Sequence, residues 1–200
     1  MSAPPVHPFA HARRLPATAL WVAAVAVGAW LAGDWLASRP YFPGPSARVP
    51  VAVGGPLLAA VLLARTLAGD DPDLERTAPR FTPAFRTLHA LLGASVPALA
   101  LALALLADPA VFGAAAVVRN TLGLAGLTLL AAVLVPVHLA WAPATLVTFA
   151  TYLAAGHADG AGVAWWGWLV RPGGADASWA VAGVLLTAGA FLYTRRGVSR

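Results

Sequence analysis

Six long apolar stretches with arginines near their ends constrain this chain more than any other feature of its sequence. An apolar run of about 20 residues crosses a bilayer as a helix, and Lys and Arg gather in the cytoplasmic loops. The pattern therefore predicts an all-α integral membrane protein with about six transmembrane helices. The stretches cover residues 17–36, 49–67, 88–107, 108–135, 141–155 and 178–194.

The composition supports a single transmembrane domain over residues 1–200. Of the 200 residues, 60% are hydrophobic and only 10% are charged, whereas soluble domains average about 25% charged residues. The net charge of +5 comes from arginines scattered between apolar runs, so we expect contact with a lipid bilayer and none with nucleic acid.

Lysine and cysteine are both missing, and each of these absences excludes a class of site. All 13 basic residues are arginines, and a phosphate-binding loop of the G-x-x-x-x-G-K-[ST] type requires a lysine. Without cysteine there is no disulfide, no thiolate metal site and no cysteine nucleophile. No Ser-His-Asp, G-x-S-x-G or H-E-x-x-H pattern is present, so we expect no enzymatic activity and no metal on this chain.

Two of the six stretches leave the span count open. Asp108 and Pro109 resemble an N-cap and a first-turn proline. The fourth stretch is then either one tilted helix from that point or a short piece followed by a span from about Arg119. The fifth stretch is short and has Pro143 near its start, so four or five spans remain alternatives to six.

The distribution of arginines predicts the orientation. With both termini in the cytoplasm, nine arginines lie inside and three outside, and Arg119 is unassigned. Only an even number of spans places both arginine-rich ends on one side. This orientation predicts a basic cytoplasmic N-terminal segment (1–16), a cytoplasmic loop (69–87) and an outer Trp-rich segment (156–177).

Arg119 and Asn120 are the candidate intramembrane polar residues. An arginine at the bilayer centre costs at least about 2.5 to 3.5 kcal/mol and usually faces a partner or water. Two interpretations follow from the sequence. In one, Arg119 lies at the outer interface and marks the start of a helix; in the other, the two residues form a buried polar site.

Histidines raise the alternative of a haem site, because paired histidines on two helices can hold a haem iron. His89 and His138 fall near the cytoplasmic ends of different spans. No further histidine pair accompanies them, so the sequence favours histidines at the membrane interface.

The loops carry two further candidate segments. The cytoplasmic segment Asp73, Leu74, Glu75 and Arg76 is either a short helix that contacts a partner or a solvated loop, because prolines limit it to one or two helical turns. Trp165, Trp166 and Trp168 are an outer aromatic segment that suits the headgroup region or a re-entrant hairpin. A platform that stacks on a substrate is the alternative role for these tryptophans.

Several segments resemble the small permeases of actinobacterial ATP-binding cassette (ABC) exporters of the type-2 group. The resemblance rests on the six-span layout and on four short sequences. These are Leu74-Glu75-Arg76-Thr77-Ala78, Val118-Arg119-Asn120-Thr121-Leu122-Gly123-Leu124, Trp165-Trp166-Gly167-Trp168 and Ala177-Ser178-Trp179-Ala180.

The resemblance implies a multi-pass protein of the bacterial cell membrane, powered by a separate ATPase subunit that binds ATP and Mg. It also implies a second permease subunit, a coupling role for residues 73–76 and an outer re-entrant hairpin before the last span. The chain is shorter than common type-2 permeases, which leaves open a complete half-pore or a companion subunit. The alternative function is a membrane anchor or accessory subunit that binds haem or quinone through His89 and His138.

Overall fold

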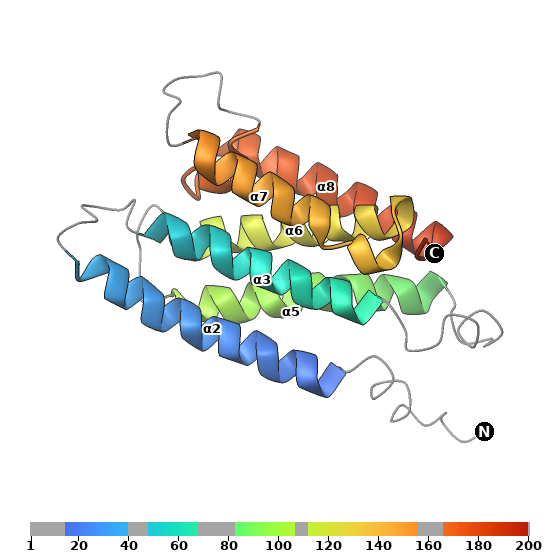
Figure 1. Cartoon of the computed structure of the whole chain (residues 1–200), viewed down its shortest axis with the longest axis horizontal. Helices are drawn as coiled ribbons and strands as arrows, with labels where there is room; N and C mark the ends of the chain where they lie inside the picture. The colour runs from blue at the N-terminus through green and yellow to red at the C-terminus, as the bar shows by residue number, and fades with distance from the viewer. Residues whose placement is uncertain (1–14, 40–47, 68–82, 107–111, 156–165, 200) are drawn as a thin grey trace.

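The computed structural model describes residues 15–39, 48–67, 83–106, 112–155 and 166–199, and these residues form helices and short connections without a strand (Figure 1). Six helical segments in it are long and apolar enough to cross a membrane, as the sequence predicts, so the chain is a multi-pass membrane protein. The elements are α2 (Leu15–Ala37), α3 (Val49–Leu67), α5 (Pro83–Ala104), α6 (Ala114–Leu134), η2 (Val137–Leu139), α7 (Ala142–Ala155), η4 (Trp168–Val170) and α8 (Asp176–Arg196).

Consecutive helices run in opposite directions, so the bundle has two distinct ends (Figure 1). We call the end at which α2 begins and α8 ends the near end. There α3 also ends and α5 begins. The opposite end, where α6 and α8 begin, is the far end. The α3–α5 connection therefore belongs to the near end, and the α7–α8 connection belongs to the far end.

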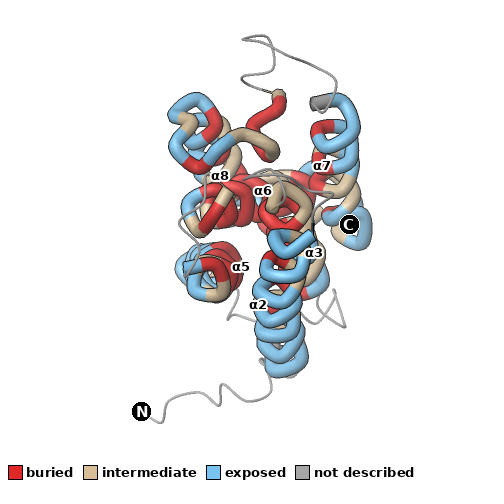
Figure 2. The backbone as a smooth tube through the Cα atoms, turned by 90° about the vertical axis from the view of Figure 1, so that its left-hand side faces the viewer, coloured by how far each residue is buried: buried red, intermediate tan, exposed pale blue. Residues whose placement is uncertain are grey.

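Helix α6 lies at the centre of the bundle and packs against α3, α5, α7 and α8 (Figure 2). In its most apolar window 67% of the residues are buried, compared with 17% in α2 at the periphery. A helix that is apolar on all sides belongs inside a bundle or in lipid. The polar side chains of α6 consequently have to find their hydrogen bonds within the protein.

The fourth span differs from both registers expected from the sequence. Helix α6 begins at Ala114, and its N-cap is Gly113, which offers no side-chain hydrogen bond. The expected cap at Asp108 and Pro109 lies outside the described residues, and the described helix starts after it. Arg119 therefore lies inside the helix, as its sixth residue, instead of at its beginning.

The fifth span is built from two pieces. Helix α7 has 14 residues, which at 1.5 Å per residue is short for a bilayer. The preceding η2 turn extends the apolar segment, so that Val137–Ala154 has 18 residues. Pro143 is tolerated because it lies in the first turn of α7, where backbone N–H groups have no helical acceptor.

Glycines allow α6 and α8 to approach closely. A Cβ atom added at Gly126 would overlap the α8 backbone at Leu185 and Leu186, and one added at Gly189 would overlap the Gly126 carbonyl. Small residues at such crossings are typical of helix packing in membranes. The contact fixes α8, and with it the segment that leads into α8, against the central helix.

Candidate functional site

Arg119 and Asn120 form a fully buried polar pair in the second turn of α6. Both side chains have an exposed fraction of 0%. The structure encloses both side chains within the bundle, and Arg119 does not mark the start of the helix. The pair lies in the far-end half of the bundle, because α6 begins at that end.

The Arg119 guanidinium binds to the segment between α7 and α8. Its Nη1 donates to the Pro172 carbonyl at 2.7 Å and its Nη2 to the Arg171 carbonyl at 2.8 Å. Its Nε and Nη2 both donate to Asn120 Oδ1, at 3.1 and 3.0 Å. These bonds use four of the five N–H donors of a guanidinium. Backbone carbonyls and one amide oxygen thus surround the positive charge, and none of these acceptors is a carboxylate.

Asn120 extends the network to α3 and η4. Its Nδ2 donates to the Ala52 carbonyl at 2.8 Å and to the Leu169 carbonyl at 2.7 Å. Pro56 explains why the Ala52 carbonyl is available. It lies four residues later in α3, where its ring nitrogen has no hydrogen to donate to Ala52. One side chain therefore completes the hydrogen bonding of two backbone segments that are distant in sequence.

Residues 166–170, which precede α8, are largely buried at the far end. Trp168, in η4, has an exposed fraction of only 3%, and its indole occupies the space beside Gly123 where a Cβ would lie. Trp168 therefore packs inside the bundle against the central helix. Trp166 is half-buried, and its carbonyl accepts a hydrogen bond from Thr151 Oγ1 at 3.3 Å. Trp165 lies outside the described residues.

The residues that precede α8 also contact α8 itself. Trp179 Nε1, in the first turn of α8, donates to the Gly173 carbonyl at 2.8 Å. A Cβ at Gly173 would press against Ala115 and the backbone N–H of Ala116, in the first turn of α6. Residues 166–175 thus contact α6, α7 and α8, and we call them the far-end clamp.

The two histidines considered for haem lie in different environments. His89 is buried in α5, and both ring nitrogens are within 3.0 Å of a side-chain oxygen, Thr66 Oγ1 at Nε2 and Tyr193 Oη at Nδ1. His138 is exposed in η2. The two histidines therefore do not form a buried pair, and a haem iron would have to displace a hydrogen bond of His89.

The expected coupling residues Asp73, Leu74, Glu75 and Arg76 lie outside the described residues. Within the described ranges, no group of three or more His, Cys, Asp or Glu side chains could hold a metal ion. The described residues contain two buried polar groups of interest. One is Arg119 with its carbonyl acceptors at the far end, and the other is His89 with Thr66 and Tyr193 toward the near end.

Sequence reasoning missed Thr66 and Tyr193, and it missed the acceptors at residues 169–172. The acceptors are backbone carbonyls, which carry no residue signature. The Ala52 acceptor did have a signal, since Pro56 within an apolar helix predicts an unpaired carbonyl four residues earlier. No protein-family model, no curated protein and no solved structure matches the chain.

Proposed function

We propose that this chain is the membrane-spanning permease subunit of an ABC transporter, an exporter that works with a separate ATPase subunit and a second permease subunit. In this proposal the near end faces the cytoplasm of a bacterial cell. The α3–α5 connection, with Asp73 to Arg76, contacts the ATPase. ATP binding by the partner moves this connection, and the helices follow.

The far-end clamp is the observation that carries the proposal. The resemblance to type-2 exporters implies an outer element that re-enters between the fifth and the last span. Support comes from the residues that precede α8, because the carbonyls of Leu169, Arg171 and Pro172 accept hydrogen bonds from Asn120 and Arg119. A chain that only anchors an enzyme has no need to place a costly arginine in a transmembrane helix in order to hold an outer loop.

The arginines support the orientation. The near end has Arg65, Arg86, Arg195 and Arg196 at the helix ends, and five further arginines precede α2, lie in the α3–α5 connection or follow α8. At the far end Arg39, Arg48 and Arg171 lie near helix ends, and Arg119 is enclosed in the bundle. Arginine-rich short loops remain in the cytoplasm during membrane insertion, which favours a cytoplasmic near end.

The test is purification of the tagged chain from its native host in mild detergent, followed by identification of every co-eluting protein. We expect an ATP-binding cassette ATPase among them. Exchange of the charges in the coupling segment, by Glu75→Arg with Arg76→Glu, should release the ATPase while the net charge stays unchanged.

A matched exchange at the far end, Asp34→Arg with Arg39→Glu, is the control, because both residues are exposed near the end of α2. It should leave the ATPase bound. The proposal is wrong if no ATPase accompanies the unmodified chain, or if the near-end exchange and the far-end exchange have the same effect.

A further inference from the structure

Three buried polar side chains from three helices meet toward the near end of the bundle. Thr66 of α3, His89 of α5 and Tyr193 of α8 have exposed fractions of 3, 8 and 3%. Helices α3 and α8 each pack mainly against α6. The histidine therefore connects two helices whose other main contact is through the central helix.

The hydrogen bonds of this junction have a defined direction. Thr66 Oγ1 donates to the Leu63 carbonyl at 2.8 Å. A hydroxyl has one hydrogen, so the Thr66 oxygen accepts the 3.0 Å bond from His89 Nε2–H. In the neutral ring Nδ1 is then an acceptor, and the Tyr193 hydroxyl donates to it at 3.0 Å. Each ring nitrogen thus holds a different helix.

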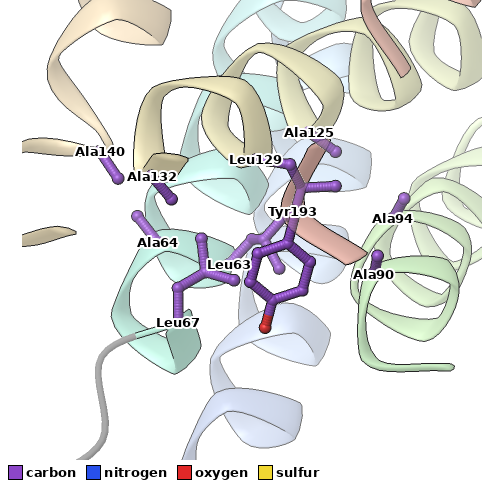
Figure 3. Close-up of a cluster of buried hydrophobic side chains, with 10 residues drawn as sticks. All are labelled: Leu63, Ala64, Leu67, Ala90, Ala94, Ala125, Leu129, Ala132, Ala140 and Tyr193. Atoms are coloured by element: carbon purple, nitrogen blue, oxygen red, sulfur yellow. The ribbon is translucent and has the colours of Figure 1, made fainter. Parts of the chain in front are cut away.

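Apolar packing keeps the junction in place. Figure 3 shows the Tyr193 ring reaching between Leu63 and Leu67 on one side and Ala90 and Ala94 on the other, and these residues belong to one buried cluster. The His89 and Tyr193 rings meet edge-on, with centroids 6.1 Å apart and planes at 63°. Such packing restricts the rotamers of both rings, so a displacement of one helix acts on the others through the hydrogen bonds.

The junction lies close to the end of α3 and the beginning of α5. Thr66 is the last residue but one of α3, and His89 is the seventh residue of α5, so both helices meet at His89 within two turns of the connection. Tyr193 is three residues from the end of α8. A displacement of the end of α3 or the beginning of α5 therefore acts on helix turns that contain Thr66 and His89.

We propose that His89 is a positioning residue that transmits displacement of the α3–α5 connection to α8. This inference rests on the proposed function, since the ATPase partner would supply the displacement. It predicts that the near ends of α3 and α8 move as one unit, and that they separate when either bond of the imidazole is lost.

The absence of cysteine makes this measurable, because two introduced cysteines are the only thiols in the chain. We would place spin labels at Arg65→Cys and Arg195→Cys, two exposed positions at the near ends of α3 and α8. In the complex with its ATPase, the distance between the labels should stay constant on nucleotide binding in the unmodified background. In His89→Leu it should change, with the amount of bound ATPase unaltered.

Conservative variants separate the two bonds of the ring. His89→Asn places an amide near the position of Nδ1 and should retain the link to Tyr193, whereas His89→Gln reaches the position of Nε2 and should retain the link to Thr66. Tyr193→Phe removes a single hydroxyl and carries the test if His89→Leu fails to fold. Ser95→Ala is the matched control, because among the described residues this exposed hydroxyl of α5 bonds only to the Leu91 carbonyl of its own helix, at 2.6 Å.

A second measurement on the purified chain without a partner keeps this inference distinct from the proposed function. Loss of His89 or of the Tyr193 hydroxyl should widen the distribution of distances between the labels, and Ser95→Ala should not. Unchanged widths in His89→Leu and Tyr193→Phe would overturn the role of His89 even if an ATPase is found. Widening without any ATPase partner would show a real junction and a wrong proposed function.

Discussion

Arg119 shows how a charged side chain is accommodated in a helix that is otherwise apolar. Its partners are an amide oxygen and two carbonyls, which present partial negative charge without a carboxylate. Asn120 links the guanidinium to the backbone, because its Oδ1 accepts from Arg119 and its Nδ2 donates to two carbonyls. The adjacent positions in the sequence thus form one unit, in which each residue completes the hydrogen bonding of the other.

Replacing Arg119 should destabilise the chain strongly. Arg119→Leu leaves the Arg171 and Pro172 carbonyls and Asn120 Oδ1 without their donor, and each unpaired buried group costs about 1–3 kcal/mol. We expect a lower unfolding temperature for the protein in detergent, as measured by tryptophan fluorescence. Arg39→Leu, at an exposed arginine that stacks on Trp35, is the control and should change stability by less than about 1 kcal/mol. Equal effects of the two substitutions would contradict the described network.

The sequence identified Arg119 and Asn120 as a pair but left their depth open. A charge within an apolar run is visible in a sequence, whereas the first residue of α6 depends on packing against α3 and α8. The sequence also drew attention to His89, but it favoured a position at the membrane interface. Its partners Thr66 and Tyr193 are ordinary residues near helix ends, and only the fold brings them within 3.0 Å of the imidazole.

At the scale of the helices, α3 depends on a side chain of α6 to complete its backbone hydrogen bonding. Pro56 leaves the Ala52 carbonyl without its helical donor, and Asn120 supplies the missing hydrogen. Asn120→Leu should therefore cost less in a Pro56→Ala background, where the backbone N–H of residue 56 can serve Ala52.

A double-mutant cycle measures this dependence. We expect a coupling free energy of about 0.5–1.5 kcal/mol from unfolding of the two single variants and the double variant. Additive effects within about 0.5 kcal/mol would indicate that Pro56 and Asn120 act independently.

The close crossing of α6 and α8 gives a prediction about helix packing. Gly189→Ala should destabilise the protein and separate the helices, because the added methyl group meets the Gly126 carbonyl. Gly183→Ala lies on the same helix with nothing within 4 Å, and it should be neutral or stabilising by up to about 1 kcal/mol. Unfolding temperatures of the two variants provide the comparison, and similar losses in both would contradict the close crossing at Gly189.

Most helix positions could be predicted from hydropathy, but their ends could not. The expected stretch 49–67 coincides with α3, because prolines and polar residues limit it on both sides. For the fourth stretch the sequence left two starts open, at Asp108 or at about Arg119, and α6 begins between them at Ala114. The spacing of glycines in the sequence does not distinguish Gly189, at the crossing, from Gly183, in open space.

At the scale of the whole molecule, six spans require that both ends of the chain lie on the same side of the membrane. Single cysteines can test this, since the chain has none of its own. In intact cells, an impermeant thiol reagent should label Gly44→Cys and Ala158→Cys, in the far-end connections. It should label Ala3→Cys and Ala78→Cys only after permeabilisation. Labelling of Ala3→Cys and Ala78→Cys on opposite sides would exclude an even number of spans between them. Labelling of both in intact cells, with Gly44→Cys and Ala158→Cys protected, would reverse the orientation argued from the arginines.

The far-end clamp has a consequence for biosynthesis. The carbonyls that receive the Arg119 guanidinium are 52 and 53 residues further along the chain. The ribosome therefore synthesises Arg119 before the carbonyls that accept its hydrogen bonds. The far-end clamp can form only after α6 and α7 have been translated, so the early helices insert without it.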